Sequence, residues 1–378
     1  MKSKNLFEIT QTGTSIWLDD LSRERLIDAE SPLSLARLIN DRFITGVTTN
    51  PAIFSQAIGT SALYDEDIRQ LAMNGKTAEE IITELTISDV QNACDQFRNI
   101  FQESDGIDGR VSIEVDPRLA RDTHATIIEA KNLWNRVDRA NVLIKVPATR
   151  EGLPAITELI AEGISVNVTL IFSVTRYDEV LDAFMQGLHR RVQSGLALAD
   201  IHSVASFFVS RVDTEVDQQL TALAPHQTTA ETLLGKAAIA NAHLAYERFS
   251  SFRDSSRWQE LEKRGARIQR PLWASTGVKD RRYPDDRYVV ELTAPHTVNT
   301  MPQATLDAVH DHGISKGDAI TPRIPDAHET IRKLAQLTID LDRVAETLEE
   351  EGLTKFVTPW LQLIDRVHHK AANVAHLT

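Results

Sequence analysis

The chain has 378 residues, of which 42% are hydrophobic and 25% are charged, and this composition is typical of a globular protein rather than a disordered or fibrous one. Its 41 basic and 54 acidic residues give a formal net charge of −13, which excludes a broad basic surface for nucleic acid or anionic lipid. The single cysteine, Cys94, excludes a disulfide framework, and with no signal peptide or membrane-spanning apolar run evident we expect a cytoplasmic protein.

Short β-rich runs alternate with longer amphipathic helical patterns. In chain order the runs cover residues 15–20, 46–50, 111–116, 141–147, 165–173, 203–210, 270–276 and 288–295. Alternating strands and helices indicate βαβ units, and eight such units predict an α/β protein with a (β/α)8 TIM barrel. An open doubly wound sheet is the alternative, and it is disfavoured because no GxGxxG motif follows the first run.

Two regions exceed the eight strand–helix units. Residues 55–105 predict a helical insertion between the second and third strands, and residues 321–378 predict C-terminal helices. We expect both to decorate one domain that spans residues 1–378. The C-terminal helices could cap the barrel or form a dimer surface, so the sequence is compatible with a monomer or a homodimer.

Polar residues recur at every second position of the predicted strands, whereas buried parallel strands are usually apolar on both faces. The apolar face must meet the helices, so the polar face points into the barrel. The interior should then contain Asp19, Thr48, Asn50, Glu114, Lys145, Asn167, Thr169 and Ser206. Buried polar groups are costly unless they bond one another or a ligand, and this concentration favours an active site over a structural polar network.

Lys145 is the only lysine in this set. An ammonium that loses hydration in a partly dry interior has a lowered pKa, and the neutral amine is a nucleophile that forms Schiff bases with carbonyl compounds. A second interpretation is equally open from the residues alone: Lys145 only forms an ion pair with Glu114 or Asp19.

Eight segments of the chain resemble the signatures of the transaldolase family. They are SIWLDDLSR (15–23), GVTTNPAIF (46–54), VSIEVDPRLA (111–120), VLIKVPAT (142–149), VNVTLIFS (166–173), SVASFFVSRVD (203–213), RPLWASTGVKD (270–280) and TVNTMP (297–302). The C-terminal extension is similar to that of the long actinobacterial form. The resemblance implies a class I enzyme of the pentose phosphate pathway that needs no metal or cofactor and acts on phosphorylated sugars.

The resemblance also implies roles for the catalytic residues. Lys145 would form a Schiff base with the ketone of fructose 6-phosphate or sedoheptulose 7-phosphate. Asp19 would take the proton of the C4 hydroxyl group and so trigger cleavage of the carbon–carbon bond. Glu114 would act as acid and base through a water molecule held by Thr169. The dihydroxyacetone unit would then pass to glyceraldehyde 3-phosphate or erythrose 4-phosphate.

The remaining motif residues are implied to bind the substrate. The pocket for the dihydroxyacetone unit would be lined by Thr48, Asn50, Asn167 and Ser206. Arg211 would bind the phosphate, for which a guanidinium fork is well suited. Many relatives have a second phosphate-binding arginine soon after the serine of the seventh strand, but residues 274–279 contain none. We expect Ser275 to donate a hydrogen bond and Lys279 to supply the charge.

Other polar signals favour ordinary structural roles. His310 and His312 fall in the last turn of a predicted helix, where the helix dipole favours histidine, so we do not expect a metal site there. Cys94 is expected to be a buried small residue. The acidic run 349–351 is expected to be a solvated helix end.

Two alternative functions remain. One is an aldolase that releases free dihydroxyacetone, which would use the same lysine and the same barrel. The other is a non-catalytic sugar-phosphate-binding protein. The joint presence of Lys145, Asp19 and Glu114 disfavours the second alternative, because a binding protein has no need for all three.

Overall fold

Eight parallel strands form a closed barrel in which β1 to β8 follow one another in chain order and β8 pairs with β1. The structure is a computed structural model and describes residues 2–225 and 227–375. The strands are β1 (Thr14–Leu18), β2 (Ile44–Val47), β3 (Arg110–Glu114), β4 (Val142–Pro147), β5 (Val166–Ile171), β6 (Ser203–Phe208), β7 (Arg270–Ala274) and β8 (Thr297–Met301). The closed parallel barrel confirms the predicted (β/α)8 fold class.

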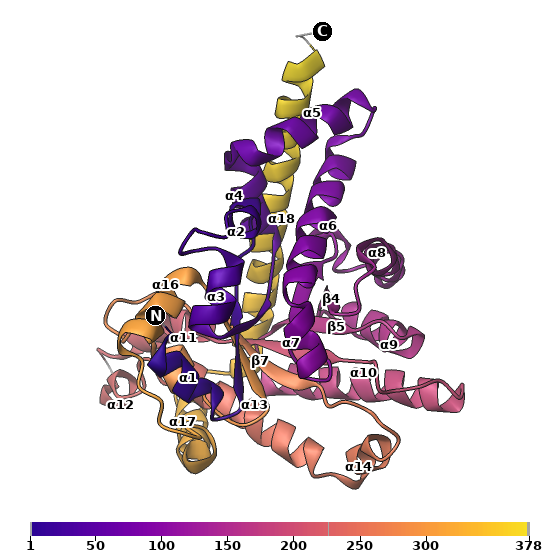
Figure 1. Ribbon diagram of the computed structural model, residues 1–378. Helices are drawn as coiled ribbons and strands as arrows, with labels where there is room; N and C mark the ends of the chain where they lie inside the picture. The colour runs from indigo at the N-terminus through magenta and orange to yellow at the C-terminus, as the bar shows by residue number, and fades with distance from the viewer. Residues whose placement is uncertain (1, 226, 376–378) are drawn as a thin grey trace.

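Helices surround the barrel and connect its strands (Figure 1). Those before β3 are α1 (Lys4–Thr10), α2 (Arg23–Ile27), α3 (Leu35–Arg42), α4 (Pro51–Thr60), η1 (Ala62–Tyr64), α5 (Asp65–Met73), α6 (Ala78–Gln96) and α7 (Arg98–Glu103). Those between β3 and β7 are η2 (Pro117–Leu119), α8 (Thr123–Val137), α9 (Gly152–Glu162), α10 (Val174–Gln193), α11 (Ser210–Leu223), α12 (Thr228–Glu231), α13 (Ala237–Arg253) and α14 (Ser256–Glu262). Those after β7 are α15 (Arg287–Val290), α16 (Gln303–His312), η3 (Thr321–Arg323), α17 (Ile324–Gln336) and α18 (Leu341–Ala375).

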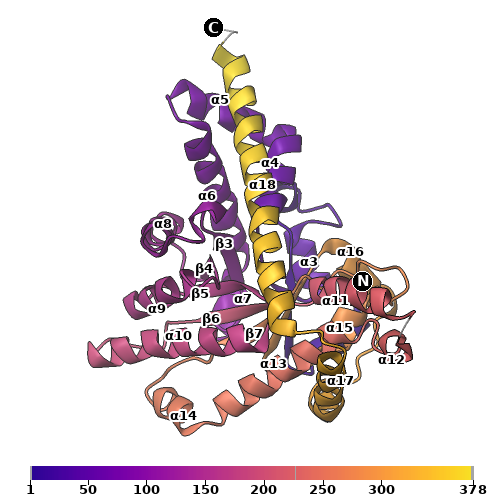
Figure 2. The same cartoon turned by 180° about the vertical axis from the view of Figure 1, so that it is seen from behind.

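The longest helix, α18, packs against α4, α5 and α6 and extends with them away from the barrel (Figures 1 and 2). It also contacts α11, η2 and β5, so it crosses the end of the barrel where the strands finish. Within the described residues, no helix is long and apolar enough to cross a membrane.

The position of the eighth strand differs from the expectation. Residues 288–295 were expected to form it, but Arg287–Val290 is the short helix α15, and β8 is Thr297–Met301. The run Tyr288–Val290 is buried. A short buried apolar run has the same hydrophobicity pattern in a strand and in a helix, which explains the error.

The strand register aligns polar side chains across the barrel. Glu114 of β3 pairs with Lys145 of β4, and Lys145 pairs in turn with Asn167 of β5. Their apolar neighbours Ile113, Ile144 and Val168 alternate with them and are buried. Because successive side chains of a strand point to opposite faces, one face packs on the helices and the other forms a polar row inside the barrel.

Strand β5 is irregular near its end. Leu170 has a φ of 59°, a left-handed backbone conformation that is uncommon for a residue other than glycine. The register between β5 and β6 shifts between Val168 and Ile171 at the same place. The irregularity follows directly after Thr169 and therefore affects how this candidate site residue is presented.

Candidate active site

Lys145 lies in the polar row inside the barrel and is 5% exposed. Its Nζ donates a hydrogen bond of 2.7 Å to the carbonyl oxygen of Thr49 and lies 3.2 Å from Oε2 of Glu114. Both side chains of this ion pair are almost fully buried. The amine therefore has one neutral acceptor and one carboxylate that could receive its proton.

Two carboxyl groups flank the lysine, and both have raised pKa values. Burial raises the pKa of Glu114, and the Lys145 ammonium only partly offsets this effect. Burial likewise raises the pKa of Asp19, against the opposing effects of Lys145 and of a hydrogen bond from Thr48. Carboxyl groups with raised pKa values beside an amine are suited to give and take protons.

Asp19 follows β1 and accepts a hydrogen bond from Thr48, which follows the neighbouring strand β2. Thr48 Oγ1 lies 2.7 Å from Asp19 Oδ1 and also 2.7 Å from Thr300 Oγ1. The adjacent Asp20 instead forms an ion pair with Arg25 at 2.6 Å. The structure thus directs the two neighbouring aspartates to different partners, and only Asp19 interacts with Lys145.

Two buried oxygen atoms in this region have no hydrogen-bond partner among the described residues. They are Oε1 of Glu114 and Oγ1 of Thr169. Buried polar atoms are nearly always hydrogen-bonded, so atoms without partners in a candidate site indicate places for a ligand or an ordered water. Glu114 keeps Oε2 for Lys145, which leaves Oε1 for such a partner.

A second hydrogen-bonded chain runs across β3, β5 and β6. Ser206 Oγ donates to Asn167 Oδ1 at 2.6 Å, and Asn167 Nδ2 donates to Ser112 Oγ at 3.0 Å. All three side chains are buried. The chain fixes the orientation of the Asn167 amide beside Lys145, its neighbour in the register.

Asn50 begins helix α4. Its Oδ1 accepts hydrogen bonds from the backbone N–H groups of Ala52 and Ile53, and Pro51 occupies the first position of the helix. An asparagine cap followed by proline is a strong helix start. Because the cap uses only the oxygen, the Nδ2 group remains available to a ligand.

The cationic end of the site is formed by Arg211 and Lys279. Arg211 lies in the first turn of α11, and its buried Nη1 has no hydrogen-bond partner among the described residues. Burial lowers the pKa of Lys279, and the neighbouring Arg211 lowers it further. Ser275 has a left-handed backbone with a φ of 55°, and its Oγ lies 3.0 Å from Ser210 Oγ, next to Arg211. The expected phosphate-binding residues are thus neighbours.

Helix α18 supplies residues that the sequence interpretation missed. The ring of Phe356 lies 5.8 Å from Lys145 Nζ. A Cβ atom on Gly352 would lie 3.0 Å from Leu170 Cδ2 and 3.6 Å from Arg211 Nη1, so the helix backbone passes close to the site. A buried glycine inside a helical pattern is the signal that could have indicated this close approach.

The expectation of a solvated helix end at residues 349–351 was wrong, because this run lies within α18. Glu349 is partly buried and lies 3.7 Å from Arg176, and Glu350 pairs with Arg121. Glu351 pairs with Lys355 at 2.7 Å. The acidic run therefore forms ion pairs around the covered end of the barrel.

Cys94, His310 and His312, for which we expected structural roles, lie outside the candidate active site. Cys94 is buried, as expected, and burial raises the pKa of its thiol. His310 contacts Arg42 at 3.0 Å, whereas His312 contacts Asp285 at 2.8 Å, so the two histidines of the pair face different partners.

Comparisons with known proteins find relatives that match nearly the whole chain. The family model described as transaldolase/fructose-6-phosphate aldolase matches residues 16–367. A protein of Thermobifida fusca named transaldolase is 52% identical over 367 residues, which cover 97% of this chain and 98% of that protein. Transaldolases of Acidothermus cellulolyticus and Mycolicibacterium smegmatis are 54% and 51% identical and are covered over 94% and 96% of their lengths. Because the family model and these relatives match a closed eight-stranded barrel over nearly the whole chain, this protein belongs to the transaldolase/fructose-6-phosphate aldolase family.

Proposed function

We propose that this protein is a transaldolase, which transfers a dihydroxyacetone unit from a ketose phosphate to an aldose phosphate. The observation that carries the proposal is the position of Lys145, buried and 3.2 Å from Glu114. Phosphorylated sugars are the proposed substrates, and the cytoplasm is the proposed compartment. A single buried cysteine is compatible with that reducing environment.

In the proposed first stage, the neutral amine of Lys145 attacks the ketone carbon of the donor. Glu114 protonates the hydroxyl group of the resulting carbinolamine through a water molecule held by Thr169, and water leaves as the Schiff base forms. The unpartnered Glu114 Oε1 and Thr169 Oγ1 support this placement of the water.

In the proposed second stage, Asp19 takes the proton of the C4 hydroxyl group. The bond between C3 and C4 then breaks, its electron pair moves into the Schiff base to form an enamine, and the aldehyde product leaves. An acceptor aldehyde reverses these steps, and hydrolysis releases the new ketose. Asn50, Asn167 and Ser206 are proposed to bind hydroxyl groups of the retained unit, beside Thr48.

The phosphate is proposed to bind between Arg211, Ser275 and Lys279. Two cationic side chains and a hydroxyl group suit a dianion. Burial and, after it, repulsion by Arg211 lower the pKa of Lys279, and bound phosphate would relieve the repulsion.

A release assay tests the proposed reaction. Fructose 6-phosphate is supplied with and without erythrose 4-phosphate, and glyceraldehyde 3-phosphate is measured. Sustained release only with the acceptor establishes group transfer. Sustained release without it assigns an aldolase that frees dihydroxyacetone, and no release in either case overturns the catalytic proposal.

A further inference from the structure

A cavity lies at the opposite end of the barrel from the candidate active site. Its volume is about 750 Å³, and it is lined in part by the first residues of four strands, Thr14, Arg110, Ser203 and Arg270. The candidate active site lies toward the other ends of the strands, and none of its residues lines this cavity.

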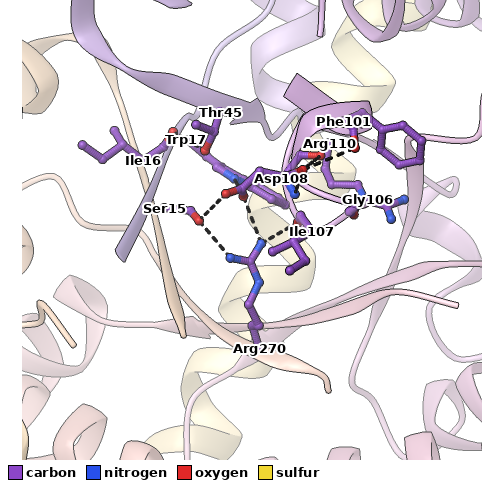
Figure 3. A network of polar contacts seen from close by, with 11 residues as sticks. Ser15, Ile16, Trp17, Thr45, Phe101, Gly106, Ile107, Asp108, Arg110 and Arg270 are labelled. Atoms are coloured by element: carbon purple, nitrogen blue, oxygen red, sulfur yellow. Dashed lines mark hydrogen bonds and ion pairs between the residues drawn. The ribbon is translucent and has the colours of Figure 1, made fainter. Parts of the chain in front are cut away.

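Three arginine side chains line this cavity, in a chain whose formal net charge is −13. Two of them have carboxylate partners. Arg270 Nη2 lies 3.1 Å from Asp108 Oδ1, and Arg267 pairs with Asp105 (the first of these is drawn in Figure 3). The charges of these two arginines are therefore compensated within the chain.

The third arginine, Arg110, is 1% exposed and has only neutral partners. Its Nε donates to the carbonyl oxygen of Gly106 at 2.7 Å, and Nη1 donates to that of Ala140 at 3.1 Å. Its Nη2 has no hydrogen-bond partner among the described residues. A buried charge without an ionic partner is costly, so this guanidinium is suited to an anion from outside the chain.

His202 lies beside the unpartnered guanidinium nitrogen. A Cβ atom on Gly106 would lie 2.9 Å from His202 Nε2 and 3.1 Å from Arg110 Nη2, so both nitrogens border the same glycine. Burial, reinforced by the three nearby arginines, lowers the pKa of His202 to about 2. The imidazole is therefore neutral and offers an N–H donor rather than a second positive charge.

Arg267 completes the donor set. Its Nε is buried without a partner among the described residues, although its outer nitrogen pairs with Asp105. Of the acidic residues that line the cavity, Asp108 is occupied by Ser15, Trp17 and Arg270 (Figure 3). Glu262 is exposed.

We propose that this cavity binds a phosphate-type dianion through Arg110, Arg267 and His202. A tetrahedral oxyanion can accept hydrogen bonds from two guanidinium groups and an imidazole at once, and guanidinium donors match its geometry. Inorganic phosphate and the phosphate group of a sugar ester share this chemistry. The site is separate from the proposed reaction and does not depend on it.

The test measures binding of inorganic phosphate to the full chain by isothermal titration calorimetry. Arg211→Met removes the proposed phosphate anchor of the active site, and Arg264→Met is a charge-matched control at an exposed position near Arg267. We expect phosphate to bind both variants. Binding should weaken at least tenfold in Arg110→Met and at least threefold in Arg267→Met.

The Arg267→Met variant keeps the proposal testable even if Arg110→Met fails to fold. The Arg267 side chain is 34% exposed, whereas Arg110 is buried. Loss of all phosphate binding in Arg211→Met would assign the anion to the active site alone and overturn the proposal. Wild-type affinity in Arg267→Met would also overturn it. Inorganic phosphate and fructose 6-phosphate, titrated into Arg211→Met, then distinguish free phosphate from a sugar ester as the preferred ligand.

Discussion

Glu114 lies directly opposite Lys145 in the register of β3 and β4, and their charged atoms are 3.2 Å apart inside the barrel. From the sequence alone, two roles for Lys145 were open: an ion pair with a carboxylate, or formation of a Schiff base. The geometry makes them compatible, because an ammonium must pass a proton to a neighbour before it can attack a carbonyl carbon. Glu114 is the nearest carboxylate that could take it.

Replacing Lys145 tests the proposed nucleophile. Lys145→Ala should abolish the covalent adduct that borohydride traps with fructose 6-phosphate, because none of the described residues places another amine in the polar row of the barrel. Lys236→Ala, which removes an exposed lysine at the start of α13, should keep the adduct. The measurement is the mass of the intact protein after reduction, and an adduct that persists on Lys145→Ala would contradict the assignment.

Glu114 and Thr169 should act as one unit if they share a water molecule. Glu114→Gln should lower kcat by about 10²- to 10⁴-fold, the usual range for lost acid–base catalysis. Thr169→Val should also lower it. The double variant should be little worse than Glu114→Gln, because either change already disrupts the same water. Steady-state kinetics of the four proteins give the coupling, and fully multiplicative losses would argue against a shared water.

The buried Asp19 carboxylate should lower the free energy of unfolding when it is ionised, although it supports catalysis. Its folded-state pKa is raised, so its favourable contribution is complete below the unfolded pKa and is lost as pH rises through the folded value. Asp19→Asn should therefore raise Tm by roughly 1–3 °C at pH 8, with a smaller gain near pH 5, and lower kcat.

The neighbouring Asp20 serves as the control for Asp19. Asp20 forms an ion pair with the largely buried Arg25, so Asp20→Asn should not raise Tm. Thermal unfolding between pH 5 and pH 8 compares the two variants. A lower Tm for Asp19→Asn at pH 8 would show that its pairing outweighs its burial.

Lys279 should contribute to binding of the phosphate. Lys279→Ala should raise KM for fructose 6-phosphate by roughly tenfold or more, since a hydrogen bond to a charged group contributes about 1.5–3 kcal/mol. Lys279→Arg should restore much of the loss, and Lys316→Ala, at an exposed position, should have no effect. The same KM in Lys279→Ala and the wild type would exclude the role.

The sequence and the structure agree where local patterns decide the outcome. Alternation at period two identified the inward faces that carry Glu114, Lys145 and Asn167, because strand geometry alone determines them. The predicted position of β8 was wrong because a short buried apolar run has the same hydrophobicity pattern in a strand and in a helix.

The contribution of α18 could not be predicted, because the path of a C-terminal helix over a barrel depends on long-range packing. The left-handed backbone of Leu170 is equally invisible in a run of strand-forming residues. It is a tertiary feature, formed where α18 crosses β5.

The close approach of α18 to β5 gives the last prediction. Even one added carbon at Gly352 would lie 3.0 Å from Leu170 Cδ2, and the two further methyl groups of valine have little room between Leu170 and Arg211. Overpacking of this kind costs about 1–3 kcal/mol and moves the backbone. Gly352→Val should therefore displace the helix from Arg211 and Lys145, raise KM and lower kcat.

Thr354→Val, at an exposed position on the same helix, should leave both constants unchanged. Because a general loss of stability would also lower activity, both variants are assayed well below their measured Tm. Wild-type kinetics in folded Gly352→Val would show that α18 covers the barrel without shaping its active site.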